Sequence, residues 1–327
     1  MHARGGFWPV AVGLLMSASD PKQTFAISSL ASSGSSRRGD QANHHSTRRL
    51  KFDQLSLFYV MVGNPFLDHH PWFVDNETGS KVADSNPNYL FPLVIKLKNW
   101  AHLDDDDVAA ILALPHTSRR LTLGQYIVRE GDVATHSCLV VEGFAMRHKV
   151  VGDGGRQIIN IHMAGDMVDL QNALLSVADH NVQTLTPMVA AFVPREAIVE
   201  LAFARPAVGR ALWLETLVEG SISREWIANV GRRDARTRVA HLLCEFAMRL
   251  ESVGLGEPCN YELPMTQEQI ADTVGLTPVH VNRTLRALDG EGLTRRSKRS
   301  VVIQDWKKLT QTGDFNSVYL HLPRDSL

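Results

Sequence analysis

Cysteine is scarce in this sequence. Only three occur in 327 residues, Cys138, Cys244 and Cys259, and they lie far apart. No CxxC pair or other metal-ligand spacing is present, so neither a zinc site nor a cysteine-held iron–sulfur cluster is expected. Such few, dispersed cysteines are typical of a reduced, cytoplasmic protein rather than a secreted one held by disulfides.

A long apolar run near the N-terminus is also missing. Residues 7–16 (FWPVAVGLLM) form an apolar run of ten residues after Arg4, about half of the roughly 20 that a transmembrane helix needs. The alternative for this run is the core of a signal peptide. We expect a cytoplasmic protein without a membrane partner.

An excess of charge of one sign is absent as well. The chain has 34 Lys and Arg, 35 Asp and Glu, and a formal net charge of −1, so any signal for nucleic acid has to be local. No Walker loop, nucleophile elbow or HExxH motif occurs, and we therefore expect no enzyme. The alternative enzyme is a cupin-like metalloenzyme, but its candidate ligands His148 and His162 lack close-set partners.

Residues 1–86 are predicted to be a disordered N-terminal extension. Within them, residues 28–49 (SSLASSGSSRRGDQANHHSTRR) contain seven serines and little that could enter a core. Residues 50–86 show no sustained hydrophobic period. Segments of this composition cannot bury enough apolar surface to fold alone.

Short β-type runs punctuated by glycine characterise residues 87–205, from about Leu90 onward. Examples are LTLGQYIVREGD and SCLVVEGFAMRHKVVGDGGRQIINIHMAGDM, in which residues 152–155 predict a hairpin tip. This spacing is typical of a small antiparallel barrel or jelly roll. Together with the helical segments that follow, it predicts an α+β fold.

Residues 206–230 predict one long helix. Its apolar residues at steps of four are Leu214, Val218, Ile222 and Trp226. Such a stripe either packs on the β-roll of the same chain or pairs across a two-fold dimer, and the pattern alone leaves both alternatives open. Residues 231–310 follow as a C-terminal domain that opens with a second helix, and residues 311–327 form a C-terminal tail.

Two capped helices joined by a glycine turn lie within the C-terminal domain. Thr266 and Gln269 match a capping box, which marks a helix start. Gly275 is the helix-ending residue expected before a tight turn. Thr277 is a good N-cap and Pro278 suits the first position of a new helix. The order of these signals predicts a helix-turn-helix.

The second of these helices has two different faces. Its inward, apolar side is formed by Val281, Leu285 and Leu288. The opposite side carries Val279, Asn282, Arg283 and Arg286, with His280 at its edge. Arg can pair with guanine, Asn with adenine, and Val can touch a thymine methyl, so this side is the predicted DNA reader. Thr266, Gln267 and Thr277 at the helix starts complete the predicted contacts.

A basic hairpin follows the reading helix. The run LTRRSKRSVVI predicts two short strands, and its basic residues are Arg295, Arg296, Lys298 and Arg299. From residue 283 to 299, six basic residues face two acidic ones, a local net charge of +4, which suits phosphate contacts. The alternative is an interaction module that binds no DNA, because basic stretches are usually solvated faces.

Over roughly residues 90–322 the chain resembles the Crp/Fnr family of bacterial transcription regulators. The motifs that carry the resemblance are RRDARTRVAHLLCEFAMRL, LPMTQEQIADTVGLTPVHVNRTLRALDGEGL and the wing. The resemblance implies a cyclic-nucleotide-binding-type β-roll, a dimerisation helix, a hinge beginning at Asp234 and a winged helix-turn-helix. It implies a homodimer on double-stranded DNA, with RNA polymerase as a candidate partner, and favours the dimer alternative for the long helix.

The resemblance carries over residue by residue only in part. Arg283 stands at the base-reading arginine of the family, and Asn282 at a neighbouring reader position. Val279 stands where the family commonly has Glu, so the target sequence of known members cannot be transferred.

The nucleotide-binding residues of the family are missing. A cyclic nucleotide pocket in this fold needs an Arg for the phosphate and a Glu for the ribose in a short cassette. Leu170 falls at the Glu position, and no Arg occurs between Arg156 and Arg195. A buried phosphate without a cation is poorly held, so cyclic AMP is not expected. Haem stays an open alternative through His148 and His162, although a lone strand histidine is more often structural.

Overall fold

The computed structural model describes residues 88–257 and 259–322, and the predicted N-terminal extension lies outside them. Two helices come first, α2 (Phe91–Lys98) and α3 (Asp105–Leu112), where β-type texture was expected from Leu90. Helix α3 starts at a capping box, because Asp104 and Asp107 each accept the other's backbone N–H. The acidic residues that start at Asp104 are the local sequence signal for this helix. The glycine spacing that predicts strands belongs to residues further along the chain.

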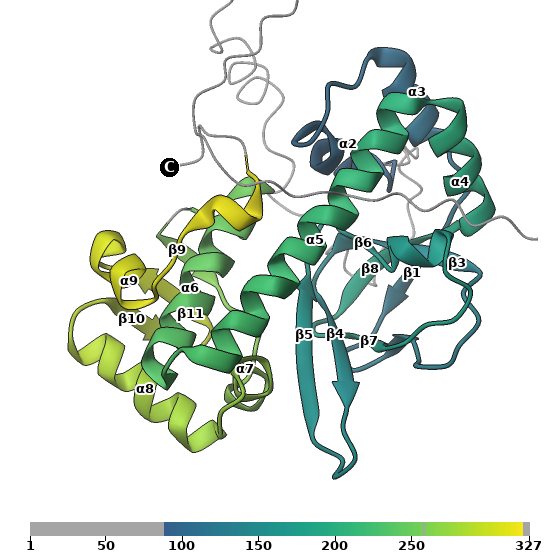
Figure 1. Ribbon diagram of the computed structural model, residues 1–327. Helices are drawn as coiled ribbons and strands as arrows, with labels where there is room; N and C mark the ends of the chain where they lie inside the picture. The colour runs from purple at the N-terminus through teal and green to yellow at the C-terminus, as the bar shows by residue number, and fades with distance from the viewer. Residues whose placement is uncertain (1–87, 258, 323–327) are drawn as a thin grey trace, which may run out of the picture. The chain divides into compact units, whose positions relative to one another are not determined.

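The β-roll consists of two four-stranded antiparallel sheets (Figure 1). Their orders are β1-β8-β3-β6 and β2-β7-β4-β5. The strands are β1 (Thr117–Leu121), β2 (Tyr126–Val128), β3 (His136–Glu142), β4 (Ala145–Val150), β5 (Arg156–His162), β6 (Met167–Val168), β7 (Asn181–Thr184) and β8 (Met188–Pro194), with the 3-10 turn η1 (Leu170–Ala173) before β7. The predicted hairpin tip is confirmed, since Val151 N–H donates to the Gly155 carbonyl at 2.9 Å.

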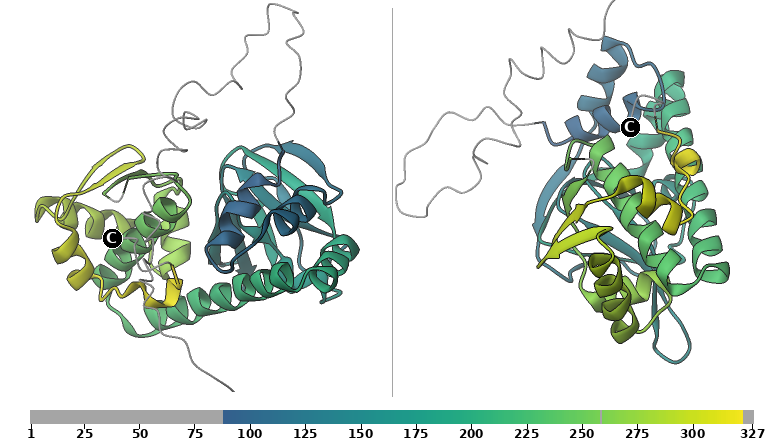
Figure 2. Two further views of the ribbon diagram at one scale, coloured as in Figure 1. Left: turned by 90° about the horizontal axis from the view of Figure 1, so that it is seen from above. Right: turned by 90° about the vertical axis from the view of Figure 1, so that its left-hand side faces the viewer.

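Helix α4 (Arg195–Ala204) leads into α5 (Pro206–Arg232), a single helix of 27 residues. Figure 2 shows α5 running without a break from the β-roll to the start of α6. Pro206 occupies its first turn, where the missing N–H costs nothing. The predicted long helix is therefore confirmed.

Three of the four residues predicted for dimer contacts are buried within their own chain. Val218, Ile222 and Trp226 are only 8%, 7% and 8% exposed because they pack into the core of their own chain. The apolar side chains left uncovered on α5 are Trp213, Leu217 and Ile227, which are 68%, 51% and 70% exposed. Helix α5 thus has two apolar faces, and most of the predicted stripe lies on the inward one.

The C-terminal domain is a winged helix-turn-helix. Its elements are α6 (Ala235–Ser252), β9 (Asn260–Glu262), α7 (Gln267–Val274), α8 (Pro278–Gly290), β10 (Thr294–Ser297), β11 (Ser300–Ile303), α9 (Trp306–Thr312) and the 3-10 turn η2 (Ser317–Leu320). The strands form one antiparallel sheet in the order β10-β11-β9. The predicted α+β fold is confirmed.

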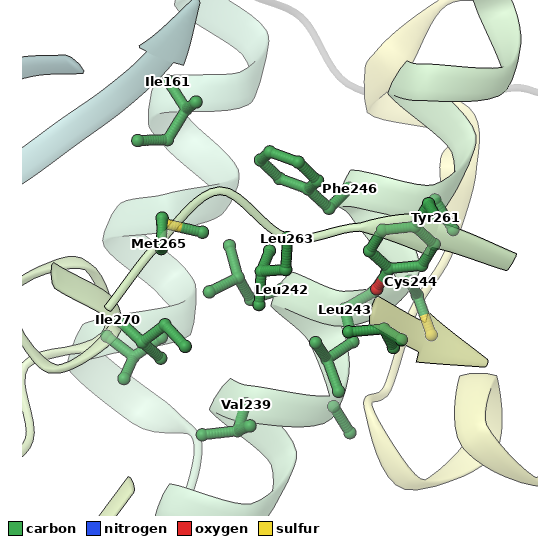
Figure 3. Close-up of a cluster of buried hydrophobic side chains, with 14 of the residues drawn as sticks. Ile161, Val239, Leu242, Leu243, Cys244, Phe246, Tyr261, Leu263, Met265 and Ile270 are labelled. Carbon is green, nitrogen blue, oxygen red and sulfur yellow. The ribbon is translucent and has the colours of Figure 1, made fainter. Parts of the chain in front are cut away.

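Helix α6 is the centre of this domain. Figure 3 shows its side chains Val239, Leu242 and Phe246 among Leu263 and Ile270 from the segments around it. From residue 239 to 250 the helix is buried on all sides, including the polar residues His241, Glu245 and Arg249. Each of these polar side chains has a buried partner, so they too point into the protein.

None of the helices within residues 88–257 and 259–322 has the length and apolar character needed to cross a membrane.

Candidate DNA-binding site

The two helices of the motif begin and end where the sequence predicts. Thr266 Oγ1 accepts from Gln269 N–H at 3.2 Å, and Gln269 Oε1 accepts from Thr266 N–H at 2.8 Å, so the capping box is formed. Gly275 ends α7 with φ +64°, a left-handed conformation that favours glycine. Thr277 then accepts from His280 N–H at 3.3 Å and starts α8. These hydrogen bonds define where both helices start, at the N-cap residues Thr266 and Thr277.

Helix α8 presents the predicted polar face to solvent. Val281, Leu285 and Leu288 are at most 1% exposed and pack into the domain core. On the other side Arg283 and Arg286 are exposed. The inward and outward assignments of α8 therefore hold in the structure.

The outward side chains of α8 gather around one hollow with the start of α7. Its volume is about 450 Å³, and it is lined by Gln267, Pro278, Val279, Asn282, Arg283 and Arg286. Val279 is 80% exposed although it is apolar. Guanidinium, amide and methyl groups thus stand side by side, which is the mixture that can distinguish base edges in a major groove. His280, at the edge, is half-buried.

The wing is formed by β10 and β11. Lys298 at its tip has a left-handed φ of +54°, and Arg295, Lys298 and Arg299 are exposed. Arg296 differs, because its guanidinium makes a pair of hydrogen bonds to Asp289 Oδ2, at 3.2 Å from Nε and 2.9 Å from Nη2. Arg296 is therefore tied to the end of α8 and braces the wing.

The predicted hinge residue lies at the junction of the two halves. Helix α5 ends at Arg232, and Asp234 caps α6 by accepting from Thr237 N–H at 2.9 Å. That hydrogen bond to backbone N–H is the main cause that lowers the pKa of Asp234 below its ordinary value. The carboxylate is thus ionised and holds the first turn of α6.

The β-roll contains a buried polar cluster that the sequence interpretation missed. Arg147 on β4 is 7% exposed, and its guanidinium contacts Glu219 on α5 and, at 3.2 Å, Asp169. Asp169 also lies 2.6 Å from His180 Nε2. Both Asp169 and His180 belong to residues 164–187, the cassette at which the resemblance places the family's nucleotide site. The sequence gives only a weak signal for this cluster, because Arg147 stands in the strand AMRHKV beside two other basic residues, His148 and Lys149.

The two candidate haem histidines are both buried, at 1% exposure for His148 and 2% for His162. Burial is the main cause that lowers the pKa of His162 to about 4, so its ring is neutral at pH 7. Its Nε2 lies 3.9 Å from Glu219 within the polar cluster. Among the residues that the structure describes, no three His, Cys, Asp or Glu side chains are grouped so as to hold a metal ion.

Comparisons with known proteins agree with this architecture. A family model described as "Cyclic nucleotide-binding domain" matches residues 118–205, and one described as "Crp-like helix-turn-helix domain" matches residues 237–312. The transcriptional activator protein FnrL of Cereibacter sphaeroides is 30% identical over 219 residues, which cover 65% of this chain and 87% of FnrL.

Two further relatives carry the name FixK. The nitrogen fixation regulation protein FixK of Bradyrhizobium diazoefficiens is 29% identical over 209 residues, covering 63% of this chain and 86% of that protein. The solved structure of FixK2 from Bradyrhizobium japonicum matches with a TM-score of 0.57 and 26% identity, covering 61% of this chain and 98% of that chain.

Together, fold and site define a DNA-binding transcription regulator with a β-roll and a winged helix-turn-helix. The chain belongs to the Crp/Fnr family. Members of this family are transcription regulators that bind DNA through the helix-turn-helix and typically act as dimers.

Proposed function

We propose that this regulator acts as a homodimer and reads DNA with the hollow between α7 and α8. The observation that carries the proposal is the grouping of Gln267, Val279, Asn282 and Arg283 around that one hollow. Arg283 pairs bidentately with guanine, Asn282 with adenine, and the exposed Val279 touches a thymine methyl. His280 and Arg286 contact the edges of the same site.

Phosphate contacts come from two other places. Arg295, Lys298 and Arg299 on the wing are exposed cations that hold the backbone without reading bases. Thr266 and Thr277 stand at the N-termini of α7 and α8, where the backbone N–H groups of a helix start favour a phosphate. Arg296 contributes indirectly by holding the wing through Asp289.

The reading role is tested by Arg283→Ala, with Arg299→Ala as a phosphate-contact variant and the exposed β-roll residue Arg119→Ala as control. Gel-shift titrations at two salt concentrations measure each against specific and random DNA. Arg283→Ala should cost about 1 to 3 kcal/mol on specific DNA and relax one base position. Arg299→Ala should weaken all sequences alike and lower the salt slope by about 1. Equal loss on specific and random DNA for Arg283→Ala contradicts the assignment.

The dimer interface that we propose lies along the uncovered face of α5. Trp213, Leu217, Gly220, Arg224 and Ile227 follow one another at alternating steps of four and three, the spacing of a two-helix seam. Leu214, the fourth apolar residue of the predicted dimer stripe, lines a hollow of about 520 Å³ with Trp213 and Leu217. Apolar side chains this exposed on one helix face favour a second copy as their cover.

Sedimentation of Leu217→Arg tests the interface. A buried charge at a two-fold seam appears twice and faces itself, so the variant should sediment as a monomer. Leu123→Arg, at a residue 60% exposed in the β-roll, is the matched control and should remain dimeric. A wild-type monomer at concentrations that saturate DNA contradicts the dimer.

We propose that cyclic AMP is not the effector of this regulator. Asp169 in the cassette and Glu219 on α5 already pair with Arg147. A phosphate placed there would meet both carboxylates, whose side chains are 1% and 17% exposed. Calorimetric titration with cyclic AMP should give no binding at micromolar concentrations, and a measured micromolar affinity overturns this point. The paired residues Arg147, Asp169 and Glu219 do not fit cyclic AMP.

We also propose that the protein has no catalytic activity, lies in the cytoplasm and has RNA polymerase as a partner.

A further inference from the structure

Residues 313–322 fold back onto the joint between α5 and α6. Leu320 at the end of η2 is 2% exposed and belongs to the core of the C-terminal domain. Gly313 lies so close to α6 that a Cβ there would sit 2.7 Å from the amide nitrogen of His241. The backbone of Gly313 packs directly against the backbone of α6, and only glycine leaves room for this contact. The segment is therefore an integral part of the C-terminal domain.

Arg233, at the joint between α5 and α6, binds residues 313–322 through Asp314. It follows the last residue of α5, and its Nε and Nη2 donate to Asp314 Oδ2 at 3.2 and 3.1 Å. Nη2 also donates to the Asp314 carbonyl at 3.2 Å, while Nη1 lies 2.7 Å from Glu225 on α5. Two charge-assisted hydrogen bonds from one guanidinium to one carboxylate fix the orientation of the Arg233 side chain as well as its distance from Asp314. The side chain of Arg233 therefore ties the joint to α5 on one side and to the C-terminal segment on the other.

Tyr319 provides a second contact between the C-terminal segment and α6, next to Gly313 at His241. Its hydroxyl donates to Glu245 Oε2 at 2.7 Å, and the same carboxylate accepts from Trp226 Nε1 on α5 at 2.9 Å. The Tyr319 ring stacks on His241 with centroids 5.8 Å apart, and His241 Nδ1 lies 3.1 Å from the Gly313 carbonyl. One buried carboxylate on α6 thus joins α5 and the C-terminal segment.

We propose that residues 313–320 are a brace that fixes the angle between α5 and the DNA-binding domain, and thereby the separation of the two recognition helices. The inference rests on the proposed dimer. Two such helices must enter the major groove about 34 Å apart. Only Arg233 and Asp234 separate α5 from α6, so holding their backbone in one conformation before binding lowers the cost of ordering it on DNA. Asp314 and Tyr319 are positioning residues of this brace.

The double variant Asp314→Asn with Tyr319→Phe, made in the full chain, tests the brace directly. Asn tolerates the left-handed φ of +45° at position 314, and Phe keeps the ring, so the fold is retained. The matched control is Asp153→Asn with Tyr126→Phe in the β-roll. Amide hydrogen exchange of residues 229–240 should become about tenfold faster in the double variant, with unchanged exchange in β4 and β5. Unchanged exchange at the joint overturns the inference.

Operators with altered half-site spacing measure the consequence for DNA. Two-half-site operators are selected with wild-type protein, and one base pair is then added or removed between the half-sites. The double variant should bind the selected operator about tenfold more weakly and discriminate less between spacings. Its affinity for random DNA and its dimer mass should not change. An unchanged spacing profile overturns the brace.

These outcomes separate the brace from the proposed function. If wild-type protein selects no two-half-site operator, the dimeric DNA-reading model fails, and hydrogen exchange at the joint still decides whether residues 313–320 restrain it.

Discussion

Replacing Arg147 by methionine should destabilise the β-roll by about 3 to 5 kcal/mol at pH 7. The side chain is buried and pairs with Asp169, which is also buried, and with Glu219 on α5. Met keeps most of the aliphatic volume, so the loss comes from leaving two carboxylates without their shared cation. Removing one partner of a buried ion pair costs far more than the net value of the pair, because the remaining charge stays buried.

The pH dependence of this loss has a definite sign. Burial raises the pKa of Asp169, but the hydrogen bond from His180 and the charge of Arg147 bring it below its ordinary value. Ionised Asp169 therefore stabilises the folded protein above the unfolded-state pKa of about 4, and this contribution is lost as the pH falls through the folded-state pKa. Without Arg147 the folded-state pKa rises, so Asp169 takes up its proton at higher pH. The stability deficit of the variant should shrink as the pH is lowered from 7 to about 4.

Urea unfolding followed by circular dichroism, at one fixed protein concentration, measures the free energy of unfolding at several pH values. The control is Arg119→Met on β1, where the exposed guanidinium lies 5.0 Å from the Phe192 ring centroid. This variant should lose about 1 kcal/mol or less, because an exposed cation over a ring contributes little. A loss for Arg147→Met no larger than for the control, or one independent of pH, refutes the role given to the cluster.

Two further predictions concern the helix-turn-helix. Thr277→Ala removes the acceptor of the 3.3 Å bond from His280 N–H and should lower stability by about 1 kcal/mol in thermal or urea unfolding; an unchanged midpoint shows that the cap contributes nothing. Gly275→Ala places a Cβ in a left-handed conformation and 3.3 Å from Val230 Cγ1, and should cost about 1 to 2 kcal/mol. Gly290→Ala, whose Cβ would meet nothing within 4 Å in helix α8, is its control and should be neutral or stabilising.

The reading helix could be predicted because its signals are local. A capping threonine, a proline in the first turn and a left-handed glycine act within four residues of where they stand, so no long-range contact is needed to recognise them. The inward position of Val281, Leu285 and Leu288 follows from the helical period alone. For α8, local preference and tertiary packing agree.

The face of α5 could not be predicted for the opposite reason. Helix α5 carries two apolar stripes. The buried stripe contains Val218, Ile222 and Trp226, and the exposed stripe contains Trp213 and Ile227. A hydrophobic period shows that a stripe packs on something but not on what. Which stripe faces the chain's own core depends on the position of β5 and α6, and that position is set by contacts between residues far apart in sequence.

The charge of the cassette depends on the same kind of long-range contact. From the sequence, the cassette lacks an arginine between Arg156 and Arg195, and this absence alone suggested that a phosphate would find no cation. The structure supplies one from another strand, since Arg147 lies 3.2 Å from Asp169. A lone cation there would favour an anionic ligand, but Asp169 and Glu219 already neutralise this one. A nucleotide would have to displace a carboxylate from Arg147 and still lie beside it in a buried site. The proposed exclusion of a phosphate therefore rests on the two carboxylates more than on a missing arginine, and we expect no cyclic AMP binding by the Arg147→Met variant in calorimetric titration.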